Sequence, residues 1–168
     1  MNKQVWIEKA LGLGIQEFEI YQSTTVEKEM TWFQGQMDTL VSSKVTGTSI
    51  RGIVDGKMAN MALEEVNDDQ CEIILKSLIE QAHIISNEET DSLRKPEPIE
   101  YVKKDVTWNM ASTEYVKDIL QSLETKILAY DPRVIQVGYL GYSQGSGSRS
   151  IVNSLGMDVQ DADEMQYI

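Results

Sequence analysis

The amino-acid sequence predicts an α+β fold, a two-layer sandwich in which two or three amphipathic helices pack on a mainly antiparallel sheet. Four strand-like runs separated by turn residues lie between Phe18 and Leu63, and two further runs lie between Val134 and Asn153. The segments between these groups carry apolar residues at helical spacing. Because an antiparallel sheet with one polar face offers its other face to such helices, the sequence favours two layers.

The first half of the chain predicts a helix followed by a four-strand meander. Trp6, Ala10 and Leu13 lie one helical turn apart, which indicates a helix over residues 2–13 that ends near Gly12 and Gly14. Turn residues at Gln34-Gly35 and Asp55-Gly56, and a short link near Gly47, then separate the strands. The four predicted strands are Phe18–Met30, Met37–Ser43, Val45–Val54 and Lys57–Leu63.

The second half predicts two more helices and a hairpin. Asn67 and Ser112 are suitable N-cap residues, and Pro132 ends the later helix. The apolar stripe of the first of these helices is Cys71, Ile74, Leu75, Leu78, Ile79, Ala82 and Ile85, and that of the second is Val116, Ile119, Leu120, Leu123, Ile127 and Tyr130. Residues 87–111, which include Pro96 and Pro98, read as a loop or linker. The predicted hairpin consists of Ile135–Tyr139, a loop at Gln144–Ser148, and Arg149–Asn153. This order leaves at least one sheet edge open, where another strand can be added.

Length and charge restrict the class of protein. A chain of 168 residues suits a single domain, 1–168. The 27 acidic residues outnumber the 15 basic ones, and the resulting net charge of −12 argues against direct binding of nucleic acid. No apolar run approaches the roughly 20 residues of a membrane span. Cys71 is the only cysteine and the first residues lack a signal-peptide pattern, so we expect a cytoplasmic protein.

One sequence motif suggests an enzyme. Residues 141–145, Gly-Tyr-Ser-Gln-Gly, match the nucleophile elbow of serine hydrolases, with Ser143 as the nucleophile. In that motif a helix follows the serine, and a histidine comes later in the chain. Here a Gly/Ser segment follows, and the only histidine, His83, lies upstream. A serine hydrolase that uses Ser143 is therefore the less favoured enzymatic alternative.

The other chemically active side chains have structural interpretations. His83 has no histidine or cysteine partner at ligand spacing, and Cys71 occupies a core position of its helix. The acidic residues at 64–69 fit a helix N-terminus, and those at 158–164 fit a solvated tail. The residues by themselves therefore predict no catalytic, cofactor-binding or metal-ligating residue, and they do not identify substrate-binding residues.

Two blocks of sequence resemble a known family. The first block consists of Thr25–Glu27, Gln34–Ser43, Gly47–Arg51 and Val54–Lys57, and the second of Asp131–Val134, continuing to Tyr142-Ser143, and Ile151–Gly156. In this order they resemble the N-terminal part of the TldD/PmbA family, whose members have been labelled modulators of DNA gyrase. We expect the PmbA (TldE) type. Gly52 lies inside a predicted strand, where glycine weakens the strand or marks a bulge.

The resemblance implies a function. TldD-type subunits carry a His-Glu-x-x-x-His zinc motif in their C-terminal half, the sister PmbA type lacks it, and the pair resembles a metallopeptidase that processes unfolded peptides. Neither half of the motif occurs in these residues. The resemblance thus implies an N-terminal domain, inactive alone, of a longer architecture that contributes a subunit interface or a surface that admits peptide. Implied partners are a sister subunit or a second copy and an unfolded peptide, and zinc would belong to a full-length partner subunit. The alternative is a free-standing protein-interaction module without a peptidase role.

Overall fold

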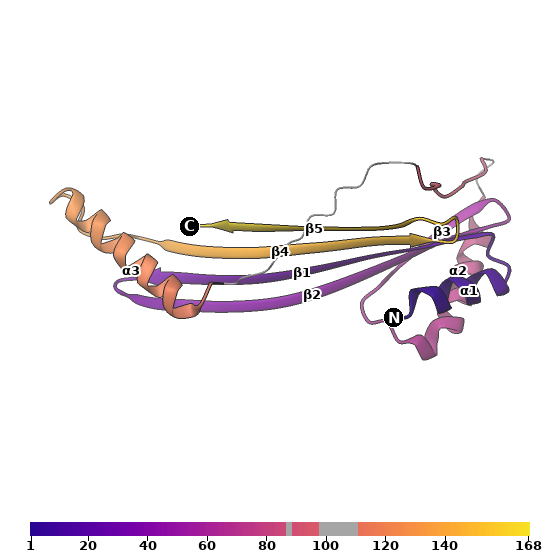
Figure 1. Ribbon diagram of the computed structural model, residues 1–168, viewed down its shortest axis with the longest axis horizontal. Helices are drawn as coiled ribbons and strands as arrows, with labels where there is room; N and C mark the ends of the chain where they lie inside the picture. Colours follow the sequence, from indigo (N-terminus) through magenta and orange to yellow (C-terminus); the bar gives the residue numbers. More distant parts are fainter. Residues whose placement is uncertain (87–88, 98–110) are drawn as a thin grey trace. The chain divides into compact units, whose positions relative to one another are not determined.

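The computed structural model describes residues 1–86, 89–97 and 111–168, and it confirms the α+β class. Within these residues, three helices and a short 3₁₀ turn accompany an open antiparallel sheet of five strands in the order β3-β2-β1-β4-β5 (Figure 1). The elements are α1 (Lys3–Gly12), β1 (Glu17–Phe33), β2 (Gln36–Val54), β3 (Lys57–Leu63), η1 (Asp68–Gln70), α2 (Cys71–Ile84), α3 (Thr113–Tyr130), β4 (Leu140–Asn153) and β5 (Asp158–Tyr167).

The predicted four-strand meander is wrong in one respect, because it contains three strands. The two strands expected at Met37–Ser43 and Val45–Val54 form the single strand β2, and Gly47 does not interrupt it. Gly47 is flanked by the β-branched residues Val45, Thr46 and Thr48, which favour an extended backbone. The predicted turns at Gln34-Gly35 and Asp55-Gly56 are confirmed, with positive φ at all four residues.

The predicted hairpin near the end of the chain is also wrong. The segment Ile135–Tyr139 is irregular, and β4 continues through the expected Gly/Ser loop to Asn153. Its hairpin partner is β5, which occupies the residues expected to form a solvated tail. Both neighbours of β4 in the sheet are strands, so pairing on two sides holds the glycines and serines in an extended backbone despite their low strand propensity.

The three predicted helices are confirmed, and only the start of α2 differs from the prediction. Asn2 and Ser112 cap α1 and α3 by accepting hydrogen bonds from the backbone N–H groups of Val5 and Tyr115. Asn67 caps the turn η1 instead of α2, which begins four residues later at Cys71. No helix within the described part of the chain is both long enough and apolar enough to cross a membrane.

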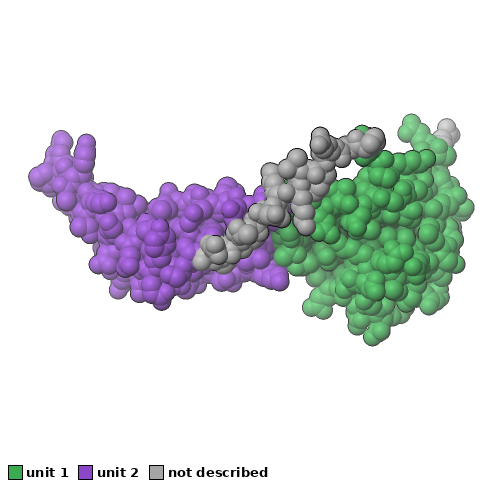
Figure 2. Space-filling view, viewed as in Figure 1, with its two compact units in different colours: residues 1–24, 46–103, 148–161 green, residues 25–45, 104–147, 162–168 purple. Residues whose placement is uncertain are grey.

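The chain divides into two compact units (Figure 2). By their residue ranges, β1, β2, β4 and β5 each contribute one part to each unit. Unit 1 comprises residues 1–24, 46–103 and 148–161. In unit 1, α1 and α2 contact each other, and α2 contacts β3. The buried apolar core of this unit is Trp6, Ile7, Ala10, Ile15, Phe18, Ile20, Ile50, Val54, Ala59, Cys71, Leu75, Leu78 and Ala82.

Unit 2 comprises residues 25–45, 104–147 and 162–168, and its helix is α3. Its described core is smaller and consists of Met30, Trp32, Val116, Leu120 and Tyr142. Tyr130, expected on the buried stripe of α3, is 88% exposed, whereas Glu124 is buried. Glu124 is on that face because its carboxylate accepts hydrogen bonds from the Trp32 indole N–H (2.8 Å) and the Gly35 backbone N–H (3.2 Å).

The loop or linker expected at 87–111 lies mostly outside the described residues, which exclude 87–88 and 98–110. Its described part, residues 89–97, has no regular secondary structure but is attached to unit 1. The Asp91 N–H donates to the Gly56 carbonyl (2.9 Å), and the Leu93 N–H donates to the Glu17 carboxylate (2.6 Å). Leu93 is buried. This stretch is therefore irregular in backbone but packed against its unit.

Candidate functional site

The geometry does not support a nucleophile at Ser143. This residue lies inside β4, and the chain continues as a strand to Asn153 without the helix that a nucleophile elbow requires. His83 lies in the last turn of α2 in unit 1, whereas Ser143 belongs to unit 2. Among the described residues, the imidazole lies 3.6 Å from one ionisable group, the exposed Asp55 carboxylate. The serine hydrolase alternative therefore has no structural support.

The buried carboxylates of both units are engaged in structural hydrogen bonds. In unit 1, Glu19 accepts hydrogen bonds from the Arg51 guanidinium (2.7 Å from Nε) and from the Asn153 amide (3.2 Å). In unit 2, Glu124 binds Trp32 and Gly35 as described above. Both carboxylates therefore already serve as acceptors for groups of the fold itself. These two residues stabilise the fold.

Cys71 and Asp68, the remaining candidate reactive groups, also have structural roles. Burial raises the pKa of the Cys71 thiol, which keeps it protonated and unreactive. Asp68, from the acidic run at 64–69, accepts a hydrogen bond from the Trp6 indole N–H (2.7 Å), and this bond lowers the pKa of the carboxyl. Across the described ranges no three His, Cys, Asp or Glu side chains come together as a metal site. The donor set of these residues therefore does not fit a zinc ion.

The feature best suited to binding is the outer edge of β2. Strand β3 pairs with β2 only from Thr48, which lies opposite Leu63, to Val54, which lies opposite Lys57. In the sheet order, β2 has only β3 and β1 as neighbours. Residues 36–47 of β2 therefore have no strand on the β3 side anywhere in the described chain. We call this stretch the β2 edge.

The β2 edge presents backbone donors at regular intervals. The N–H of Thr39 donates to the side-chain Oγ1 of Thr31 in β1 (3.0 Å), and the carbonyl of Ile53, at the other end of β2, accepts from the Gln16 N–H (2.8 Å). Both groups therefore point away from the open side. Because backbone groups point alternately to the two sides of a strand, those of the even-numbered residues, such as Leu40 and Ser42, are directed outward.

The side chains along the β2 edge do little to hinder the addition of another strand. Asp38 and Lys44 are its only charged residues, and four of its apolar side chains are exposed: Met37, Leu40, Val41 and Val45. By contrast, β5 at the other edge of the sheet carries Asp158, Asp161, Asp163 and Glu164. Charged residues discourage the addition of a strand to an edge. The β2 edge is therefore the more receptive of the two.

Comparison with known proteins agrees with the sequence blocks noted above. Residues 18–86 match the family profile described as PmbA/TldA metallopeptidase domain 1, and residues 107–168 match that described as the PmbA/TldA metallopeptidase central domain. The chain belongs to the PmbA/TldD family. No curated protein sequence matches it.

Several solved structures share the fold. The chain is 18% identical to TldE from Thermococcus kodakarensis, with a TM-score of 0.79 over 96% of this chain and 37% of that one. It is 19% identical to a proposed modulator of a DNA gyrase from Thermotoga maritima, with a TM-score of 0.77 over 98% of this chain and 37% of that one. A similarly described Bacteroides thetaiotaomicron protein is 18% identical, with a TM-score of 0.71 over 97% and 38%. The chain thus spans under two fifths of the length of these proteins.

Proposed function

We propose that this chain is a non-catalytic part of a PmbA/TldD-type metallopeptidase assembly that processes unfolded peptides, and that its β2 edge receives an extended polypeptide. The supporting observation is the open stretch of β2 before Thr48, with outward backbone groups and few charges. Membership of the family supports the link to a peptidase. Cleavage, and any zinc ion it requires, would come from a sister subunit or another part of the assembly, because the donor groups of the described residues do not fit a zinc site.

Recognition at a strand edge would explain how such an assembly accepts varied sequences. An extended peptide beside β2 would exchange N–H···O=C bonds with the outward groups of alternate residues. These bonds involve only the backbone of the peptide. Each contributes about 0.5–1.5 kcal/mol net, and an unfolded peptide loses conformational entropy on binding, so the affinity will be modest.

Peptide titration of the 168-residue chain tests this proposal. We expect an unstructured peptide to bind with a Kd between micromolar and millimolar and to perturb the NMR amide signals of residues 36–47. Ser42→Pro removes an outward N–H, and proline is tolerated on a sheet edge, so this variant should stay folded and bind at least about fivefold more weakly. Ser42→Ala keeps the backbone donor and is the matched control. Unchanged affinity in Ser42→Pro, or no binding at millimolar peptide, would contradict direct substrate binding at this edge.

The same edge supports a second candidate function, the docking of another subunit. A strand of a sister subunit or of a second copy could pair with the β2 edge by the same backbone bonds. Sedimentation velocity of the chain, alone and mixed with a sister subunit, separates the two functions. Association that Ser42→Pro weakens, with no binding of free peptide, would favour the interface. A free-standing interaction module would instead bind a protein that has no peptidase connection.

A further inference from the structure

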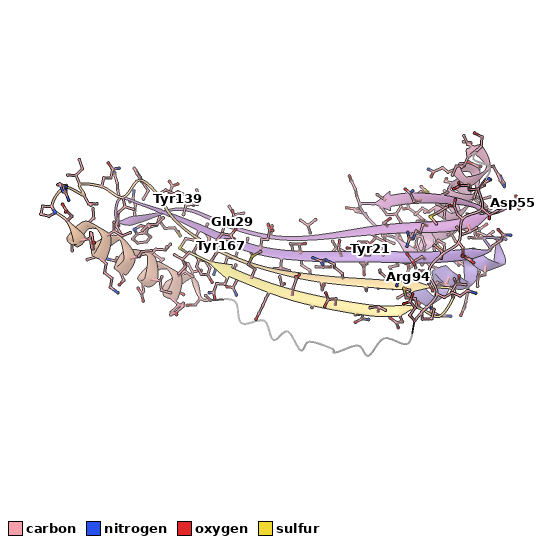
Figure 3. All side chains as sticks on the ribbon, turned by 90° about the horizontal axis from the view of Figure 1, so that it is seen from above. Tyr21, Glu29, Asp55, Arg94, Tyr139 and Tyr167 are labelled. Atoms are coloured by element: carbon pink, nitrogen blue, oxygen red, sulfur yellow. The ribbon has the colours of Figure 1, made fainter. Side chains whose placement is uncertain are left out.

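Unit 2 contains a second site candidate, a cavity of about 390 Å³ at one end of β1, β4 and β5. Its volume falls within the roughly 300–1,000 Å³ of small-ligand sites. The lining side chains with polar or aromatic groups include Glu29, Thr31, Tyr139, Ser143 and Tyr167. Tyr139, Glu29 and Tyr167 lie near one another in Figure 3, although they come from three separate segments of the chain.

The ring of Tyr139 is positioned by a glycine. A β-carbon placed on Gly141 would lie 2.5 Å from Tyr139 Oη and 2.9 Å from Cζ, so the ring lies directly over this glycine. Tyr139 is nevertheless 69% exposed, and Tyr167 is 56% exposed. Two tyrosine rings thus border the cavity with much of their surface available to a ligand.

The charge of the cavity is negative. Glu29 is the only side chain that is charged at neutral pH among the described residues that line it. Glu29 is exposed, and no hydrogen bond or ion pair joins its side chain to another described residue. Its carboxylate is therefore accessible as an acceptor for a ligand, whereas those of Glu19 and Glu124 are buried and hydrogen-bonded within the fold. The chain as a whole carries a net charge of −12, which would also attract a cation.

We propose that this cavity binds an organic cation, an ammonium or guanidinium group on an aliphatic stem, as in a lysine or arginine side chain. Tyrosine faces attract cations through the ring quadrupole, and the Glu29 carboxylate would form a charge-assisted hydrogen bond with the same group. The apolar stem would lie against the tyrosine rings. An anion would be repelled by Glu29, and a neutral ligand would leave the carboxylate unused. This site goes beyond the proposed function and does not depend on the β2 edge.

NMR titration of the whole chain with n-butylammonium, and with n-butanol as a neutral analogue, tests the proposal. We expect butylammonium to shift the amide signals of Gly141 and Ser143 and butanol to shift them far less. Glu29→Gln and Tyr139→Leu should each weaken binding about two- to fivefold. Equal binding of the two compounds, or unchanged affinity in Glu29→Gln, would overturn the cation site.

Three further variants separate a binding role from a structural one. Gly141→Ala should displace the exposed Tyr139 ring while leaving the strand intact, so it should weaken butylammonium binding without lowering stability. Glu27→Gln removes a carboxylate two positions along β1 that does not line the cavity, and Tyr130→Leu removes an exposed tyrosine from the end of α3. Both controls should bind as the parent chain does. Normal binding by Gly141→Ala with a displaced Tyr139 signal would contradict the role given to the ring.

Competition experiments identify the source of the cation. A capped Gly/Ser peptide with one lysine, tested against the same peptide with norleucine, represents a polypeptide side chain, and spermidine represents a free amine. Displacement of butylammonium by the lysine peptide alone would assign the cavity to polypeptides, and displacement by spermidine alone would assign it to free amines. Displacement by neither would overturn the proposal. Because Ser42 does not line this cavity, failure at the β2 edge and failure here are distinguishable.

Discussion

The two units are built from parts of the same strands, but they bury very different amounts of apolar surface. Unit 1 encloses two helices and a core of thirteen described residues, several of them large aliphatic or aromatic side chains. Among its described residues, unit 2 has one helix and a core of five residues. In unit 2 a buried carboxylate, Glu124, occupies a position on the helix where an apolar residue would be expected.

This difference in apolar burial assigns most of the stability to unit 1 and most of the accessible binding surface to unit 2. The apolar burial in unit 1 supplies most of the hydrophobic free energy of folding. Unit 2 leaves residues 36–45 of the β2 edge and the tyrosine-lined cavity accessible, and exposed apolar or aromatic groups of this kind are typical of interaction sites. Regions that bind ligands are commonly among the less stable parts of a fold. We therefore expect substitutions in unit 1 to affect mainly folding and those on the surface of unit 2 to affect mainly binding.

The largest effect is expected from Trp6→Ala in unit 1. Trp6 is fully buried, and its indole N–H donates to Asp68 (2.7 Å). Truncation should lower the free energy of unfolding by about 3–5 kcal/mol, measured by urea denaturation. Tyr130→Ala, at an 88% exposed position of unit 2, should change it by less than about 0.5 kcal/mol. Similar losses in the two variants would break the contrast between the units.

Glu124→Leu should have the next largest effect, in unit 2. The substitution leaves the Trp32 indole N–H and the Gly35 N–H without their acceptor, at a cost of about 2–4 kcal/mol in total. Glu124→Gln keeps one acceptor oxygen and should lose about half as much. Amide hydrogen exchange at Gly35 would locate the change. An unchanged free energy of unfolding in Glu124→Leu would show that the stability of unit 2 rests on apolar packing and not on these two hydrogen bonds.

Gly52→Ala tests how tightly unit 1 is packed. A β-carbon at this position would lie 2.9 Å from Ile15 Cγ2 and 3.0 Å from Leu78 Cδ2, so the core must shift at a cost of about 1–3 kcal/mol. At Gly47 the nearest atom would be Ser23 Oγ, at an ordinary contact distance of 3.6 Å. Gly47→Ala should therefore be neutral or slightly stabilising. Thermal denaturation of the two variants makes the comparison.

The smallest expected effect is a pH dependence of unit 1. The hydrogen bond from the Trp6 indole lowers the pKa of Asp68, helped by the Asn2 backbone N–H. The ionised carboxylate therefore contributes stability above the pKa of the unfolded chain, near pH 4, and this contribution is lost as the pH falls through the lower folded value. Asp68→Asn should flatten this part of a stability profile recorded between pH 2 and pH 6.

Asp131 in unit 2 provides the matched comparison for this pH effect. Its pKa is lowered by hydrogen bonds from Arg133, only two residues away. An unfolded chain can form much of this local contact, so Asp131→Asn should leave the stability profile almost unchanged. A flattened profile in Asp131→Asn but not in Asp68→Asn would mean that the pH dependence of stability arises from Asp131 and not from Asp68.

The sequence predicted the fold class and the helices because these depend on local patterns. The caps at Asn2 and Ser112 and the turns at Gln34-Gly35 and Asp55-Gly56 act within a few residues. The hairpin near the end failed because pairing with distant strands, and not local propensity, keeps Gly145 extended. A β-carbon at Gly145 would lie 3.7 Å from the Val26 carbonyl of β1, a neighbour that the local sequence does not reveal.

The binding surfaces were only partly predictable for the same reason. The sequence indicated an open sheet edge, but not that β3 stops opposite Thr48 and leaves residues 36–47 uncovered. Gly52, read as a weak point or bulge, pairs regularly with Ala59, and it is small because Ile15 and Leu78 approach it. The cavity was missed altogether. Glu29, Tyr139 and Tyr167 are far apart in sequence, and only the folded sheet brings them together.

The position of β4 between β1 and β5 has a consequence for synthesis on the ribosome. β1, β2 and β3 are complete at Leu63, but the strand that covers the other side of β1 begins at Leu140. At about 5–20 residues per second, a nascent chain would wait roughly 4–15 seconds for β4 to emerge. During that interval Glu19 lacks the amide of Asn153, and the backbone of β1 can pair with other chains. Slow translation of this region would therefore favour aggregation, and holdase chaperones would have their greatest effect there.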